Sequence, residues 1–161
     1  HLQDVCIELA QQLVNVFLFD RSVNIRRSAS AAFQEGVGRH GKFPNGLELI
    51  HVADFLSVSS RVGCYLKIAP FVAQFKDYGA SIVSHLANNR IQHWDIDIRM
   101  LAAQSLSIIA KDHQELITTD ILASICSSCE SYDIDIKHGG YEALANILWV
   151  MDVDIEILKI F

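Results

Sequence analysis

One ten-residue pattern recurs along the chain, and its clearest copies read Asn24-Ile25-Arg26-Arg27-Ser28-Ala29-Ser30-Ala31-Ala32-Phe33 and Asp97-Ile98-Arg99-Met100-Leu101-Ala102-Ala103-Gln104-Ser105-Leu106. A weaker copy spans residues 135–144, and a degenerate one spans residues 61–68. The clear copies share a polar residue, an isoleucine, a basic residue, small residues and a final large apolar residue. A polar cap followed by apolar residues that return to one face after two turns predicts a helix.

The spacing of the copies predicts a repeat architecture. We take four basic residues as equivalents: Arg26, Arg61, Arg99 and Lys137. They give steps of 35, 38 and 38 residues, slightly short of the roughly 40–47 residues of HEAT and armadillo units but in that class. Small residues within the copies would let a neighbouring helix approach closely: Ala29, Ala32, Ala102 and Ala103.

The segments before the copies are also amphipathic. The first of them places apolar residues at helical spacing: Val5, Leu9, Leu13, Val16 and Phe17. Each unit therefore reads as a helix, a short turn and a second helix. The predicted helices span residues 4–18, 24–37, 46–56, 60–74, 78–90, 96–110, 115–130 and 135–150. We expect residues 153–161 to open the next unit.

We predict an all-α fold, a right-handed α-solenoid of about four HEAT-like antiparallel helix pairs. Because the repeats are continuous, residues 1–161 are expected to form a single repeat segment without an internal domain boundary, and to be a fragment of a longer solenoid. Hydrophobic residues make up 51% of the chain, which argues against disorder.

Composition excludes several classes of function. Thirteen basic residues against nineteen acidic ones give a net charge of −6, which argues against a nucleic-acid groove or a polybasic membrane patch. No apolar run approaches the roughly 20 residues of a membrane helix. Four cysteines are too few for a secreted disulfide framework, so we expect a cytosolic protein with reduced thiols.

Residues 36–43, GVGRHGKF, match the phosphate-binding pattern G-x-x-x-x-G-K up to its last position, where Phe43 replaces the Mg²⁺-binding hydroxyl. Such a loop follows a strand, whereas residues 29–35 read as helix. We therefore predict a helix that ends at Gly36 or Gly38, followed by a tight turn. A nucleotide-using enzyme that depends on Lys42 is the less favoured alternative.

Other reactive residues point to structural roles. Cys126 and Cys129 form a C-x-x-C motif without a second pair, so we expect core cysteines rather than a metal or redox site. The pairs Asp95/Asp97 and Asp133/Asp135 recur at one place in the repeat, as helix caps would. We predict no catalytic residues, no metal site and no cofactor.

Aromatic residues in the turns are candidates for partner binding. Trp94, within His93-Trp94-Asp95, and Phe43, before Pro44, lie in predicted turns. Each is either an exposed interface anchor or a ring packed over helix ends. The hypothetical partner-binding residues are Arg39, Phe43, His93 and Trp94.

The sequence resembles the tubulin-folding cofactor D family, a HEAT/armadillo-repeat family. The resemblance is carried by residues 26–35, 37–39, Gly41, Phe43-Pro44 and Gly46, and by residues 93–95, Arg99, 101–103 and Leu106. It extends from about Val5 to Leu144, and the chain departs from the family pattern at Gly36, at His40 and in much of 111–135.

This resemblance implies a large, non-catalytic chaperone that binds β-tubulin and helps to assemble or dismantle the α/β-tubulin heterodimer. Its implied partners are tubulin-folding cofactors C and E and an Arf-like small GTPase, and its place is the cytoplasm and cytoskeleton. The complex would promote GTP hydrolysis by tubulin. The alternative is another HEAT-repeat scaffold or adaptor, separated from the first reading by residues 33–35 and 93–95.

Overall fold

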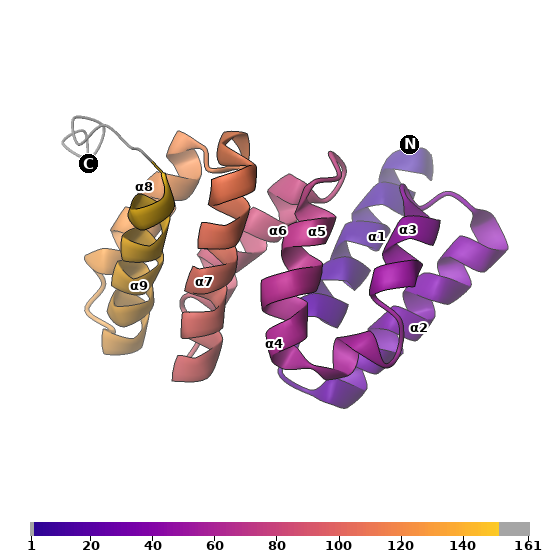
Figure 1. Ribbon diagram of the computed structural model, residues 1–161, viewed down its shortest axis with the longest axis horizontal. Helices are drawn as coiled ribbons and strands as arrows, with labels where there is room; N and C mark the ends of the chain where they lie inside the picture. The colour runs from indigo at the N-terminus through magenta and orange to yellow at the C-terminus, as the bar shows by residue number, and fades with distance from the viewer. Residues whose placement is uncertain (1, 152–161) are drawn as a thin grey trace. The chain divides into compact units, whose positions relative to one another are not determined.

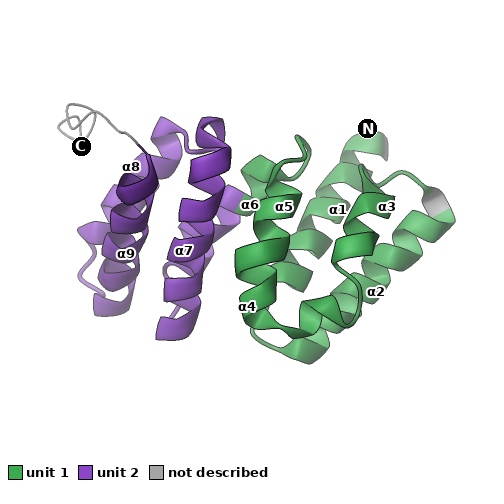
Figure 2. Ribbon diagram, in the orientation of Figure 1, with its two compact units in different colours: residues 1–82 green, residues 83–161 purple. Residues whose placement is uncertain are grey.

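The computed structural model describes residues 2–151, and every regular element within that range is a helix (Figure 1). The prediction of an all-α chain is confirmed for these residues, whereas the unit predicted to open at 153–161 lies outside them. The chain divides into two compact units, residues 1–82 and residues 83–161 (Figure 2). Each unit is described by itself below.

The first unit contains two long helices followed by shorter ones. They are α1 (Leu2–Phe19), α2 (Val23–His40), α3 (Gly46–Val52), α4 (Arg61–Gly63) and α5 (Ala69–Ala73), followed by the start of α6 (Gly79–His85). A π-helical segment, Cys64–Ile68, joins α4 to α5 without a break. The ring of Pro70 explains this segment, because proline cannot donate to the carbonyl four residues earlier and pushes that turn open.

Aromatic side chains hold the first unit together. The ring of Phe33 on α2 packs edge-on against Phe17 of α1, with centroids 5.6 Å apart, and lies 5.2 Å from the ring of Phe43. Phe19 meets Tyr65 at 4.9 Å. All these rings are buried, so α1, α2 and the π-helical segment share one core.

The predicted inner face of α1 is wrong in part. Phe17 is buried as expected, but Val5 and Leu9 are 59% and 51% exposed. The buried face includes Asn15 instead, whose Nδ2 donates to Ser81 Oγ at 3.0 Å. A polar side chain turns inward because it finds this partner.

The second unit places α7 (Ile96–Asp112), α8 (Thr119–Cys129) and α9 (Ile134–Val150) together, with α9 packed against both others (Figure 1). A π-helical segment, Leu86–Arg90, extends α6 into this unit. A Cβ atom at Gly139 would lie 1.6 Å from the carbonyl oxygen of Ile91. Glycine is therefore required for α9 to approach the end of that segment.

Two helices end at other residues than predicted, and local interactions explain where they end. Helix α2 runs past Gly36 and Gly38 and ends at His40, with Gly41 in the left-handed conformation at φ 57°. Helix α3 ends at Val52, earlier than predicted, where the Asp54 carboxylate accepts bonds from the amides of Leu56 and Ser57 instead. Such local side-chain acceptors compete with helix continuation.

The register of the repeat also needs correction. Arg26, Arg99 and Lys137 are each the fourth residue of their helix, but Arg61 is the first residue of α4. Cys64 occupies the fourth position there. Of the alanines predicted at helix contacts, Ala29, Ala102 and Ala103 are buried, whereas Ala32 is exposed.

Candidate functional site

Phe43 belongs to the core of the first unit. Its ring is 8% exposed and packs beside Phe33. A Cβ atom at Gly36 would lie 2.5 Å from this ring, so the glycine makes room for it. Of the two readings of Phe43, the structure supports packing, and the ring is not an exposed anchor.

The same packing argues against a phosphate-binding loop at residues 36–43. Residues 36–40 are helical, and the Phe43 ring occupies the space beside Gly36. A phosphate-binding loop needs free backbone amides ahead of a helix N-terminus, whereas these amides lie within the last turns of α2. Arg39 is exposed on that helix and pairs with Glu35 one turn earlier.

The turn before α7 holds His93 and Trp94 in a fixed arrangement. The amide of Asp95 donates to His93 Nδ1 at 2.9 Å, and the two rings lie 5.3 Å apart, tilted by 31°. Asp95 then caps α7 by accepting from the amide of Asp97. The Trp94 side chain is 65% exposed, so the exposed reading of this residue, not the packed one, describes the structure.

A buried arginine fixes the carbonyl groups of this turn. Arg99 is 4% exposed, and its Nη1 donates to the carbonyls of His93 at 2.7 Å and Trp94 at 2.9 Å. The same nitrogen lies 3.0 Å from Asp135 Oδ1 on α9. Arg99 thereby fixes the backbone carbonyls at and just before the exposed tryptophan.

Arg26 repeats this device in the first unit. It is 2% exposed and donates to the carbonyls of Asp20 and Arg21, which precede it by six and five residues. It also donates to the carbonyls of Val58 and Ser59, which precede α4. Arg26 and Arg99 therefore each tie the turn before their own helix to the following repeat.

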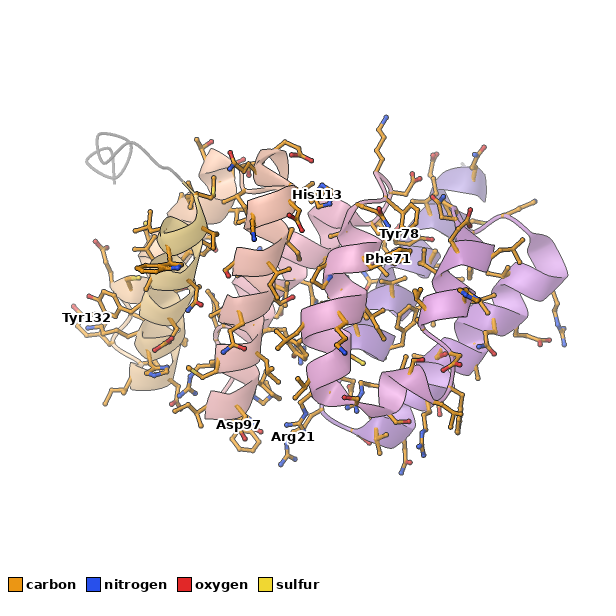
Figure 3. The ribbon with its side chains drawn as sticks, in the orientation of Figure 1. Arg21, Phe71, Tyr78, Asp97, His113 and Tyr132 are labelled. Atoms are coloured by element: carbon orange, nitrogen blue, oxygen red, sulfur yellow. The ribbon has the colours of Figure 1, made fainter. Side chains whose placement is uncertain are left out.

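The turn before α9 is a feature that we did not predict as a site. Tyr132 is fully exposed, Ile134 is 81% exposed, and Asp133 caps α9 by accepting from the amides of Asp135 and Ile136. Figure 3 shows Tyr132 at the outer edge of its turn. The predicted capping role of the recurring carboxylates is confirmed for Asp95 and Asp133.

The cysteines have the surroundings of structural residues. Cys129 is buried, Cys126 is half-buried, and burial raises the pKa of both thiols above the usual value. Burial raises the pKa of Cys64 to about 11. Raised values keep the thiols protonated, which disfavours metal binding and nucleophilic reactivity. No group of three or more metal-binding side chains occurs among residues 2–151.

Within the part of the chain that the structure describes, no helix has the length and apolar character needed to span a bilayer.

Comparisons with known proteins agree on one family. A family model described as tubulin-specific chaperone D-like, ARM repeats, matches residues 1–47. The tubulin-specific chaperone D of Dictyostelium discoideum is 37% identical over 149 residues, which cover 91% of this chain and 10% of that protein. The tubulin-folding cofactor D of Schizosaccharomyces pombe is 38% identical over 94 residues, 58% of this chain and 8% of that protein.

No solved structure matches the chain significantly. The chain spans about a tenth of the length of the curated relatives that it matches. The similarity nevertheless covers 91% of the chain. The chain is therefore a homologue of one segment of tubulin-specific chaperone D, with armadillo-type repeats.

Proposed function

We propose that this chain is a segment of a tubulin-folding chaperone that binds β-tubulin and assists assembly and disassembly of the α/β-tubulin heterodimer. The observation that carries the proposal is the 37% identity to tubulin-specific chaperone D over 91% of the chain. The proposed role is non-catalytic, because binding and holding a large client needs surface rather than reactive groups.

The described residues support a scaffold of this kind. Helix pairs recur along both units, and buried arginines fix the turns between helices. We propose that the pairs continue as a right-handed α-solenoid of about four HEAT-like units over residues 1–161. Solenoids of this type offer long concave surfaces to large partners.

The remaining parts of the proposal follow from the family. The complete protein would act in the cytoplasm and on the cytoskeleton, with tubulin-folding cofactors C and E and an Arf-like small GTPase as partners. It would stimulate GTP hydrolysis by tubulin as part of that complex, and the nucleotide would be held by tubulin. The exposed Arg39 and Trp94 and the half-buried His93 are the side chains proposed to contact a partner, whereas Phe43 is buried.

The test uses the full-length protein with purified tubulin. Affinity-tagged protein should retain β-tubulin on a column, and a HEAT-repeat scaffold from another family serves as the control. Failure to retain tubulin would favour a different adaptor function.

Amine cross-linking of the retained complex then tests whether this segment contacts β-tubulin. The exposed lysines of the chain, such as Lys42, Lys67 and Lys137, should form cross-links to β-tubulin. Cross-links confined to other parts of the protein would keep the family and move the β-tubulin site out of this segment.

A further inference from the structure

The turns before α7 and α9 carry the same five-residue sequence pattern. The first reads Trp94-Asp95-Ile96-Asp97-Ile98, and the second reads Tyr132-Asp133-Ile134-Asp135-Ile136. The fold accounts for three of the five positions. The first aspartate of each caps its helix, the second lies in the first helical turn, where the helix dipole favours a negative charge, and Ile98 is fully buried.

The aromatic residue and the first isoleucine of each pattern are exposed instead. Trp94 and Ile96 are 65% and 53% exposed, and Ile134 is 81% exposed beside the fully exposed Tyr132. The first unit provides an internal comparison. Before α2 and α4 the corresponding pairs are Arg21 with Val23 and Ser59 with Arg61, so the fold forms this turn without an aromatic residue.

The two patterns lie next to each other. Helices α7 and α9 pack side by side (Figure 1), and contacts between their first turns show that both begin at the same end. Arg99 Nε donates to His138 Nδ1 at 3.4 Å, and Arg99 Nη1 lies 3.0 Å from Asp135 Oδ1. Four exposed side chains thus share one end of the second unit, and we call them the aromatic–isoleucine surface: Trp94, Ile96, Tyr132 and Ile134.

The surroundings of the aromatic–isoleucine surface are acidic. Asp97 and Asp133 are exposed within the two patterns. A hollow of about 400 Å³ adjoins the second pattern at Ile136 and is also lined by Gln92, several serines and Glu130, the one charged residue in its lining. Among the basic groups at the start of α7 and α9, Arg99 is buried and bonded, His138 is half-buried and Lys137 is exposed.

We propose that the aromatic–isoleucine surface binds a segment of a partner protein that combines apolar side chains with lysine or arginine. The apolar side chains would cover Trp94 and Tyr132, while a basic group enters the hollow beside Glu130. Aromatic residues on a rigid backbone are favoured anchors of such interfaces, and charge complementarity guides the approach of the partner. A second copy of this chain is disfavoured as the partner, because the acidic groups of the two copies would face and repel each other. The proposal holds whether or not the client is tubulin.

The experiment selects peptides from a random 16-residue library displayed on phage, with the full-length protein as bait. A second selection uses the double variant Trp94→Ser, Tyr132→Ser. Serine is chosen because Ser59 occupies the corresponding position before α4. Peptides enriched on the wild-type protein alone should have a net positive charge and apolar residues. A synthetic peptide of the enriched sequence should bind the double variant about tenfold more weakly or worse.

Two matched variants separate the parts of the proposal. Asp97→Asn should weaken binding of the peptide and reduce its dependence on ionic strength, because one attractive charge is lost. Phe55→Ser removes a half-exposed aromatic from the first unit and should leave binding unchanged. An unchanged melting temperature of each variant confirms that folding is intact.

Enrichment of acidic peptides, or no difference between wild type and double variant, would overturn the proposal. A wild-type dimer in sedimentation that the double variant abolishes would also overturn it, because the surface would then join copies of the chain.

Discussion

Two arginines, Arg26 and Arg99, occupy the interior of a molecule whose other charged side chains mostly meet solvent. Each is less than 5% exposed and donates to several backbone carbonyl groups at once. Removing such a group leaves several buried acceptors without donors, a larger loss than that of the bonds themselves. These residues should therefore dominate the stability of the repeat.

Arg99→Ala should lower the free energy of unfolding of the second unit by about 3 kcal/mol, through loss of the bonds to His93, Trp94 and Asp135. Urea unfolding followed by tryptophan fluorescence measures this directly, because both tryptophans, Trp94 and Trp149, lie in that unit. The matched control is Lys137→Ala, at the same helix position but exposed, which should change stability by less than about 0.5 kcal/mol. Equal effects of the two variants would contradict the role assigned to Arg99.

Glycine at position 139 is a second single-residue constraint. Gly139→Ala should cost about 3 kcal/mol, because the new methyl group would overlap the Ile91 carbonyl oxygen and force α9 outward. Gly38→Ala is the control, since no atom lies within 4 Å of the new methyl group. It should stabilise α2 by about 0.5–1 kcal/mol. Thermal unfolding followed by far-ultraviolet circular dichroism compares both, and a neutral Gly139→Ala would refute the close approach.

At the scale of single elements, the sequence patterns located the helices well and their faces less well. Capping residues and apolar spacing placed most helix ends within a few residues of those observed. The inner face of α1 was mispredicted, because hydrophobicity alone cannot reveal that Asn15 meets Ser81, 66 residues away. The π-helical segments were not predicted either. Only Pro70 signals one of them locally, and the other has no sequence marker that we recognise.

The candidate site was predictable only where the signal was a repeated motif. Trp94 drew attention as an aromatic in a turn, but its exposure depends on tertiary packing. Phe43 had the same signal and is buried, because Gly36 opens a space for its ring. Tyr132 was missed, although the comparison of residues 94–98 with 132–136 contains the information. Aligning the turns as well as the helices of the repeat would have found it.

Helix α6 carries a titratable group that makes its unit sensitive to acid. Burial, with a smaller contribution from Arg90, lowers the pKa of His85 to about 4. An unfolded histidine titrates near 6.5, so the unfolded state takes up a proton first as the pH falls. Stability is therefore full above about pH 6.5 and should drop by about 2–3 kcal/mol by pH 4.5.

Urea unfolding of the second unit at several pH values measures this effect. The variant His85→Gln keeps a polar side chain of similar size without the titration, and its stability should depend less on pH between about 4.5 and 6.5. The same pH dependence in wild type and variant would show that other groups are responsible.

For the molecule as a whole, the exposed apolar residues of α1 affect behaviour in solution. Val5, Leu9 and Val16 are 59%, 51% and 36% exposed and recur at helical spacing. Contiguous apolar surface of this kind promotes association. The 161-residue chain should therefore self-associate as its concentration rises, as measured by sedimentation velocity, and Leu9→Lys should reduce this. Gln12→Lys adds the same charge at another exposed position of α1, and an equal reduction by that variant would show that charge alone is responsible.

The arginine bonds described above have a consequence for how the chain opens. Arg26 joins the carbonyls of residues 20–21 to those of residues 58–59, so the turn before α2 cannot loosen while the turn before α4 stays in place. Arg99 couples the turns of α7 and α9 in the same way. Local fraying, the usual weakness of linear repeats, is thereby converted into the concerted loss of two neighbouring repeats. In hydrogen–deuterium exchange, the protected amides of α7 and α9 should accordingly exchange at a common rate.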